Sequence, residues 1–216
     1  MNNAIVQIFI PAKGWKDQDR LNWQSNEVLN LSNILVRNYA KKYSAEYILI
    51  KEPKINFRHP TWERFRLFDD FWSNSFDHIL YLDTDVFTWP DSPNIFEKLK
   101  DDSLNIVTHS GNKFVNNQPM FNAGVFAINK KIIKSMKKYI SLKYWEQNFL
   151  TDPNWEDSKE LNKIAQNEDV KKNWLEKKWN MKNSPDAYFT HLWGGQKKFN
   201  PNMPAIIKAR EIVSKF

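Results

Sequence analysis

Two carboxylates, Asp83 and Asp85, follow an apolar run in residues 78–87. On an extended strand, alternate side chains point to the same face, so the two acids are expected to project together. The run Ile-Leu-Tyr-Leu before them is typical of a strand buried on both faces of a parallel sheet, and ligands bind beyond the carboxyl ends of such strands. Neighbouring carboxylates repel unless a cation lies between them, and oxygen ligands with room for phosphates suit Mg²⁺ or Mn²⁺. The segment therefore predicts a divalent-metal site that holds a diphosphate.

Strands and helices are expected to alternate along the first half of the chain. The pattern predicts strands at residues 5–10, 47–50, 79–82 and 105–108, and a loop that enters a strand within residues 121–129. Helices are predicted at residues 22–43, 62–73, 95–100, 131–144, 157–166 and 205–215. This order predicts one α/β domain over residues 1–216, with a mostly parallel central sheet flanked by helices and a Rossmann-like nucleotide-binding N-terminal half.

Composition narrows the classes of function. The net charge is +7, but the lysines are scattered and no nucleic-acid motif occurs, so no nucleic-acid partner is expected. The chain has no cysteine, which excludes disulfides and thiolate metal sites. No apolar run is long enough to span a bilayer and no signal segment is recognised, so a cytoplasmic location is expected. Glycine-rich phosphate-binding loops are also missing from the sequence.

Several motifs resemble, in order, those of nucleotide-sugar glycosyltransferases of the GT-A fold. Residues 82–85 look like their metal-binding Asp-x-Asp segment, and residues 59–64 resemble the His-Pro-x-Trp-x-Lys stretch of galactosyl/xylosyltransferase family thirty-four. Residues 122–129 resemble its Asn-x-Gly-x-Phe strand, residues 155–158 lie where it has Asp-Asp-Gln, and residues 191–197 resemble its His-x-x-Gly-x-x-Lys. The pair at 179–180 is similar to a Trp-Asn of glycogenin-like enzymes. A narrower resemblance is to domains that glycosylate the capsid proteins of large algal viruses.

The resemblance implies a role for each matched position. Metal ligands would be Asp83, Asp85 and His191, and the imidazole nitrogen favours Mn²⁺ over Mg²⁺. Lys197 would neutralise the diphosphate, and Glu156 or Asp157 would act near the anomeric carbon, although Ser158 replaces the family's Gln. The positions expected to contact the nucleotide sugar are Pro11, Ala12, Lys13, Arg64, Asp83, Asn122, Ala123, Gly124, Gly194 and Lys197.

These roles predict a metal-dependent glycosyltransferase that moves a sugar from a UDP-sugar to a hydroxyl of a glycan or glycoprotein, with retention of configuration. Residues 1–110 would bind the donor and residues 111–216 the acceptor. Retention leaves two mechanisms open, a front-face reaction and a covalent carboxylate intermediate. One alternative is a phosphohydrolase of the haloacid dehalogenase type, although Phe87 stands where that family needs Thr or Val. Another is a non-catalytic module that binds carbohydrate or nucleic acid.

Overall fold

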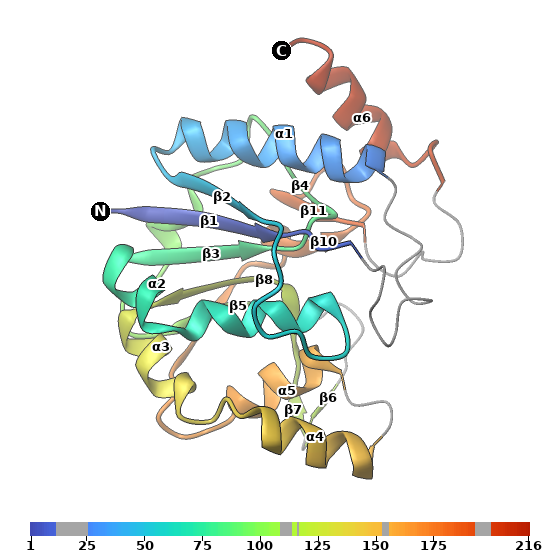
Figure 1. Cartoon of the computed structure of the whole chain (residues 1–216). Helices are drawn as coiled ribbons and strands as arrows, with labels where there is room; N and C mark the ends of the chain where they lie inside the picture. The colour runs from blue at the N-terminus through green and yellow to red at the C-terminus, as the bar shows by residue number, and fades with distance from the viewer. Residues whose placement is uncertain (12–25, 109–113, 116, 153–155, 193–199) are drawn as a thin grey trace.

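A six-stranded sheet forms the centre of the computed structural model, which describes the whole chain except residues 12–25, 109–113, 116, 153–155 and 193–199 (Figure 1). The strands lie in the order β2-β1-β3-β8-β5-β9. β8 runs antiparallel to both its neighbours, whereas the other pairs in this sheet are parallel. The mostly parallel sheet predicted from the sequence is therefore confirmed. Its strands are β1 (Asn3–Ile8), β2 (Glu46–Ile50), β3 (His78–Leu82), β5 (Leu104–Thr108), β8 (Phe121–Asn129) and β9 (Lys172–Leu175).

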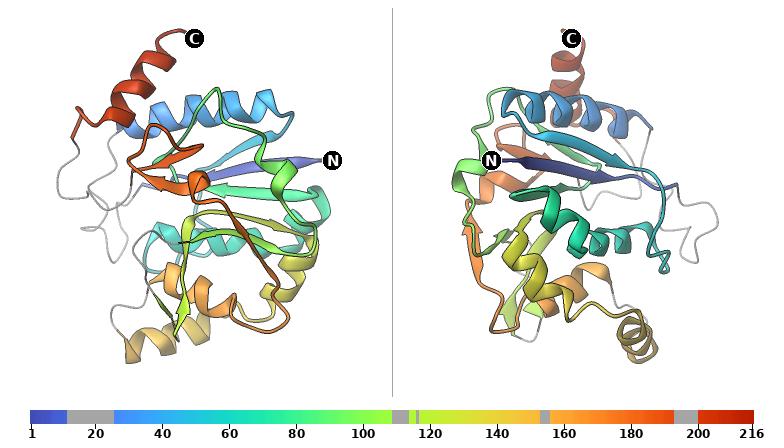
Figure 2. Two further views of the ribbon diagram at one scale, coloured as in Figure 1. Left: turned by 180° about the vertical axis from the view of Figure 1, so that it is seen from behind. Right: turned by 60° about the vertical axis from the view of Figure 1, so that its left-hand side comes forward.

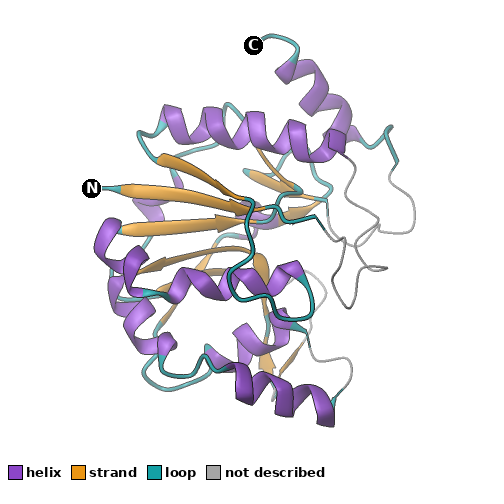
Figure 3. Cartoon of the chain, in the orientation of Figure 1, coloured by secondary structure: helices purple, strands orange, loops and turns teal. Residues whose placement is uncertain are grey.

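Helices cover both faces of this sheet (Figure 3). Side chains alternate along a strand, so Ala4 and Val6 of β1 enter one apolar cluster while Ile5 enters the other. The first cluster is covered by a 3-10 helix at Pro60–Phe68 and by α2 (Asp70–Ser75), α3 (Lys130–Lys137), α4 (Leu142–Thr151) and α5 (Asp157–Ile164). The second is covered by α1 (Asn26–Lys42) and the 3-10 helices Ile95–Lys98 and Lys177–Asn180.

A smaller sheet lies beside the carboxyl end of β3. It contains β4 (Val86–Thr88), β10 (Met181–Lys182) and β11 (Phe189–His191), and it is seen from behind in Figure 2. β11 pairs antiparallel with β4, which places His191 opposite Val86. The strands β6 (Phe114–Val115) and β7 (Gln118–Pro119) form a separate pair. The C-terminal helix α6 (Pro204–Val213) packs against α1. No helix in the described part of the chain has the length and apolar character needed to cross a membrane.

Several predicted elements need correction. The helix predicted at residues 62–73 is the 3-10 helix followed by α2, because the chain is extended at Asp69. The helix predicted at residues 131–144 is two helices: α3 ends at Lys137, and α4 begins after Ser141, whose backbone is extended. This break lets Trp145 pack against Trp62 and Phe65. Residues 121–129 form one strand rather than a loop that enters a strand. Residues 22–25 of the first predicted helix lie outside the described residues.

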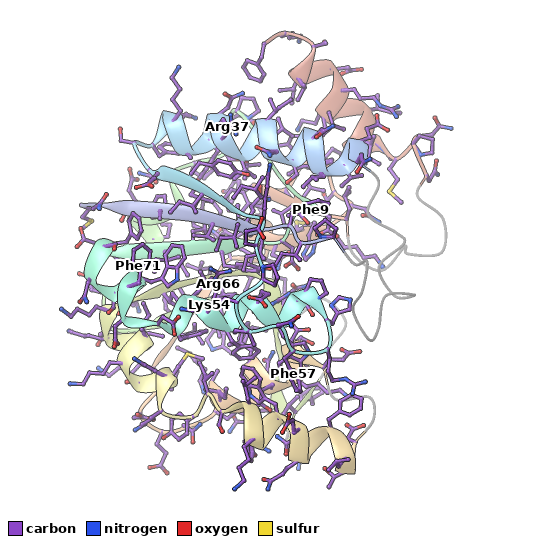
Figure 4. The ribbon with its side chains drawn as sticks, in the orientation of Figure 1. Phe9, Arg37, Lys54, Phe57, Arg66 and Phe71 are labelled. Atoms are coloured by element: carbon purple, nitrogen blue, oxygen red, sulfur yellow. The ribbon has the colours of Figure 1, made fainter. Side chains whose placement is uncertain are left out.

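The loop between β2 and the 3-10 helix is held by a buried carboxylate (Lys54 and Phe57 are labelled in Figure 4). Glu63 accepts backbone N–H bonds from Lys54, Ile55 and Asn56 at 2.7–3.1 Å. The ring of Phe57 packs edge-on against Trp62, with 4.8 Å between centroids. Buried polar groups of this kind must be satisfied, and here the carboxylate fixes the segment that leads into the 3-10 helix.

Candidate active site

A turn, rather than a strand, carries the two acids. β3 ends at Leu82, and the N–H of Val86 donates to the carbonyl of Asp83 at 3.0 Å. The expectation that Asp83 and Asp85 share one face of an extended strand is therefore wrong. The turn still brings them together: one ligand atom each from Asp83, Asp85 and His191 lie within 4.8 Å of one another.

Buried side chains from β1 and α1 fix this turn. Gln7 donates to the carbonyl of Asp83 and to the hydroxyl of Ser32, both at 3.0 Å, and Ser32 donates to the carbonyl of Val86 at 2.7 Å. The hydroxyl of Tyr47 donates to Gln7 at 2.9 Å. Sequence reasoning missed this network. Its signal was a glutamine inside an otherwise apolar strand and a serine on the buried face of a helix.

His191 reaches the acids from β11. Its Nε2 lies 3.1 Å from Oδ1 of Asp85 and 3.6 Å from Oδ2 of Asp83, and its Nδ1 lies 3.0 Å from Oδ1 of Asn180. With Oδ1 of Asn180 as the acceptor, the neutral imidazole carries its hydrogen on Nδ1. Its Nε2, which faces the acids, then carries the lone pair that a metal-binding histidine requires. Burial opposes protonation of the imidazole, but the nearby Asp85 carboxylate outweighs it and raises the pKa of His191. Without a cation, a proton on His191 offsets the charge of the acids.

Two observations show that these residues fit a divalent cation. Oδ2 of Asp85 is buried and accepts no hydrogen bond from any described residue. A Cβ placed on Gly124 would lie 2.2 Å from Cε1 of His191 and 2.6 Å from Oδ2 of Asp83, so the ligands close over a residue without a side chain. Gly124 lies in an extended strand, so space rather than an unusual backbone angle requires it. Two carboxylates and an imidazole suit Mn²⁺, and carboxylates alone suit Mg²⁺.

Arg64 contacts Asp83 from the other side. Its Nη2 lies 3.2 Å from Oδ1 of Asp83, which also accepts a 2.6 Å bond from the hydroxyl of Tyr81. Its Nη1 donates to the carbonyl of Ala123 at 2.6 Å. Burial opposes the charge of Arg64, but Asp157 and the other neighbouring acids outweigh it and raise its pKa. Sequence reasoning missed Tyr81, whose alternation with Asp83 along the chain was the available signal.

Asp157 and Glu156 have different surroundings at the start of α5. Oδ1 of Asp157 accepts a 2.9 Å bond from Thr61, and its Oδ2 lies 2.9 Å from Nε of Arg64. The Asp157 side chain is only 12% exposed, whereas Glu156 is exposed. Arg64 thus links Asp157 to Asp83, which places one of the two predicted carboxylates beside the candidate metal ligands.

The remaining predicted positions divide into described and undescribed residues. Asn122, Ala123 and Gly124 lie on β8 next to the turn, and the N–H of Asp83 donates to the carbonyl of Gly124 at 2.8 Å. Pro11 is exposed beyond the carboxyl end of β1, the end at which Asp83 follows β3. The predictions for Ala12, Lys13, Gly194 and Lys197 lie outside the described residues.

Neither a family model nor a curated protein matches the chain. Solved structures do. The galactosyltransferase LgtC, in complex with donor and acceptor sugar analogues, is 16% identical, with a TM-score of 0.66 over 99% of this chain and 96% of that chain. A glycosyltransferase involved in glycosylation of the major capsid of PBCV-1 is 11% identical, with a TM-score of 0.58 over 91% of this chain and 97% of that chain.

Mouse xyloside xylosyltransferase 1 is also similar, at 12% identity and a TM-score of 0.53 over 94% of this chain and 99% of that chain. The three neighbours are glycosyltransferases and differ in sequence by more than four residues in five. What they share with this chain is the arrangement of the mixed sheet and its flanking helices. The chain therefore has the GT-A fold of nucleotide-sugar glycosyltransferases, as the sequence motifs predicted.

Proposed function

We propose that the chain is a divalent-metal-dependent glycosyltransferase. It moves a sugar from a nucleoside diphosphate sugar, with UDP as the nucleotide, to a hydroxyl of a glycan or glycoprotein. The observation that carries this proposal is the meeting of Asp83, Asp85 and His191 at the carboxyl end of β3 in a GT-A fold. Ligands of open α/β sheets bind at such strand ends.

Asp83, Asp85 and His191 would hold Mn²⁺, with Mg²⁺ as the alternative ion. A cation bound there supplies positive charge that stabilises the diphosphate as it leaves the sugar. Oδ2 of Asp85 accepts no hydrogen bond from the described residues, and Nε2 of His191 lies 3.1 Å from Oδ1 of the same carboxylate, which supports this assignment. Oδ1 of Asp83 accepts hydrogen bonds from Tyr81 and Arg64, so Oδ2 is the oxygen that would hold the ion.

The other residues bind and orient the donor and acceptor. Asn122, Ala123 and Gly124 would border the donor sugar, and Pro11, Ala12 and Lys13 are assigned to the nucleoside. Gly194 and Lys197 are assigned to the diphosphate by the motif resemblance, and the lysine charge would assist departure of the leaving group. Glu156, which is exposed, stabilises positive charge at the anomeric carbon or binds a sugar hydroxyl.

In this proposal residues 1–110 form the donor-binding half of the chain and residues 111–216 the acceptor-binding half.

The motif resemblance implies retention of configuration. Of the two open mechanisms, attack by Asp157 requires its carboxylate to leave Thr61 and Arg64 first. The cytoplasmic location stays a prediction.

A screen of nucleotide sugars tests the activity. Purified protein with Mn²⁺ is incubated with UDP-, GDP- and CMP-sugars, and release of the nucleotide and thermal stabilisation are measured. One UDP-sugar is expected to raise the melting temperature in Mn²⁺ and to release UDP, and EDTA is expected to remove both effects. Asp85→Asn should lose the effect of UDP-sugar while keeping the melting temperature of the ligand-free protein.

The same experiment separates the alternatives. A phosphohydrolase would release phosphate from simple phosphate esters without any nucleotide sugar. A carbohydrate-binding module would bind glycans equally well in EDTA and after substitution of Asp85. Either result would exclude the proposed transfer reaction. The glycosyltransferases among the similar structures do not favour these two alternatives.

A further inference from the structure

An unbroken chain of polar contacts runs from α5 to the candidate metal ligands. Thr61 donates to one oxygen of Asp157, and Arg64 lies 2.9 Å from the other. The same guanidinium lies 3.2 Å from Oδ1 of Asp83, whose Oδ2 faces His191. Arg64 therefore lies between a carboxylate that belongs to the candidate metal site and one that does not.

Arg64 is a potential competitor of the cation. Its side chain is only 4% exposed, so water screens its charge poorly. A guanidinium forms strong charge-assisted bonds to carboxylates, and its fork can engage both oxygens of one acid. If Arg64 paired with Asp83 alone, it would draw that carboxylate away from the ion. In this structure it is held elsewhere: Nη1 donates to the carbonyl of Ala123, Nε donates to the carbonyl of Thr61, and Nε lies beside Asp157.

We propose that Asp157 is a positioning residue of the metal site. By pairing with Arg64, it holds the guanidinium in a place where only one nitrogen touches Asp83 and leaves Oδ2 of Asp83 available to the cation. This role differs from that of a nucleophile, because the Asp157 carboxylate acts on the metal site through Arg64. The inference rests on the metal site of the proposed function.

Three variants should differ in Mn²⁺ affinity, because they change the charges and contacts around Asp83 in different ways. Asp157→Asn removes the counter-charge of Arg64, so Arg64 turns to Asp83 and Mn²⁺ affinity falls. The double variant Asp157→Asn with Arg64→Met removes the competitor as well and has the net charge of the original chain. Its Mn²⁺ affinity should recover most of the loss. Thr61→Val keeps every charge but removes one anchor of Asp157, so it should weaken Mn²⁺ binding less than Asp157→Asn does.

The experiment measures Mn²⁺ binding to the full chain by the loss of the free-ion signal in electron paramagnetic resonance. Circular dichroism and melting temperature report folding of each variant. For Asp157→Asn we expect a roughly 10-fold loss of affinity, the lower end of the range found when a direct partner of a metal ligand is removed, because Asp157 contacts Arg64 rather than a ligand. Asp152→Asn is the matched control, since this half-buried acid pairs with Lys159 and lies outside the chain of polar contacts from Thr61 to Asp83. It should bind Mn²⁺ as the original chain does.

The outcomes separate the inference from the function on which it rests. No Mn²⁺ binding by the original chain, alone or with UDP, would refute the metal site itself. Mn²⁺ binding that Asp157→Asn leaves unchanged would refute the positioning role and keep the site. A double variant that binds as weakly as Asp157→Asn, although folded, would show that Asp157 acts through packing rather than through Arg64. Should Asp157→Asn fail to fold, Thr61→Val carries the test, and affinity equal to that of the original chain would overturn the proposal.

Discussion

The substitution Gly124→Ala adds one methyl group to the tightest point of the candidate metal site. That methyl carbon would lie 2.2 Å from Cε1 of His191, whereas ordinary van der Waals contact begins at 3.4 Å. The imidazole must therefore retreat by more than an ångström. The ring cannot do so freely, because its Nδ1 is hydrogen-bonded to Asn180 and His191 lies on β11, which is paired with β4. The same methyl carbon would lie 2.6 Å from Oδ2 of Asp83, so that carboxylate must move as well.

Displacement on this scale should disable the site more than it harms the fold. Misplacement of a functional group by about 1 Å costs about a hundredfold in rate, and overpacking of a core costs about 1–3 kcal/mol of stability. We expect Gly124→Ala to lower Mn²⁺ affinity at least about tenfold, measured by electron paramagnetic resonance, with a moderate fall in melting temperature. Ala127→Val is the control: it overpacks the same strand inside the apolar cluster that faces α1. That variant should lose stability but bind Mn²⁺ normally. Unchanged Mn²⁺ affinity of folded Gly124→Ala would refute the geometry.

Three further results are expected. Gln7→Leu should weaken Mn²⁺ binding measured by calorimetry, because the carbonyl of Asp83 loses its buried donor; full affinity would show that the turn holds without it. The pKa of His191 is raised, so a proton competes with the metal for its imidazole. Apparent Mn²⁺ affinity should therefore fall about tenfold per pH unit below that pKa and level off above it. An affinity independent of pH between about 5 and 8 would contradict this. Burial lowers the pKa of His78, so the folded state resists protonation of this side chain. The stability of the metal-free protein should therefore fall as the pH drops below about 6.5. In thermal melts His78→Gln should flatten this fall, and an identical fall in the variant would contradict the reasoning.

Sequence patterns predicted the parts of the site that are close in the chain or carried by motifs. An apolar run that ends in two acids marked the end of β3, and the motif around His191 supplied the third candidate ligand. The wrong step was to extend β3 through Asp85. The pattern does not show that the chain turns at Thr84, because that turn depends on Gln7 and Ser32, which are far away in the sequence.

Tertiary contacts also explain the missed elements. A continuous helix at residues 131–144 satisfies local periodicity, but the chain breaks so that Trp145 can reach the ring of Trp62. β9 is an edge strand with a polar, partly exposed sequence, so it lacks the apolar signal of an inner strand. The short strands β4, β10 and β11 form through pairing with one another, with β11 in the middle, and such pairing has no local signature in the sequence.

Crystals grown with Mn²⁺ and UDP, measured near the manganese absorption edge, provide the most direct test of metal and nucleotide binding by this chain. We expect one strong anomalous peak about 2 Å from carboxylate oxygens of Asp83 and Asp85 and from Nε2 of His191, in contact with the diphosphate. A peak elsewhere on the protein, or bound UDP with no metal between these three side chains, would contradict the proposed site.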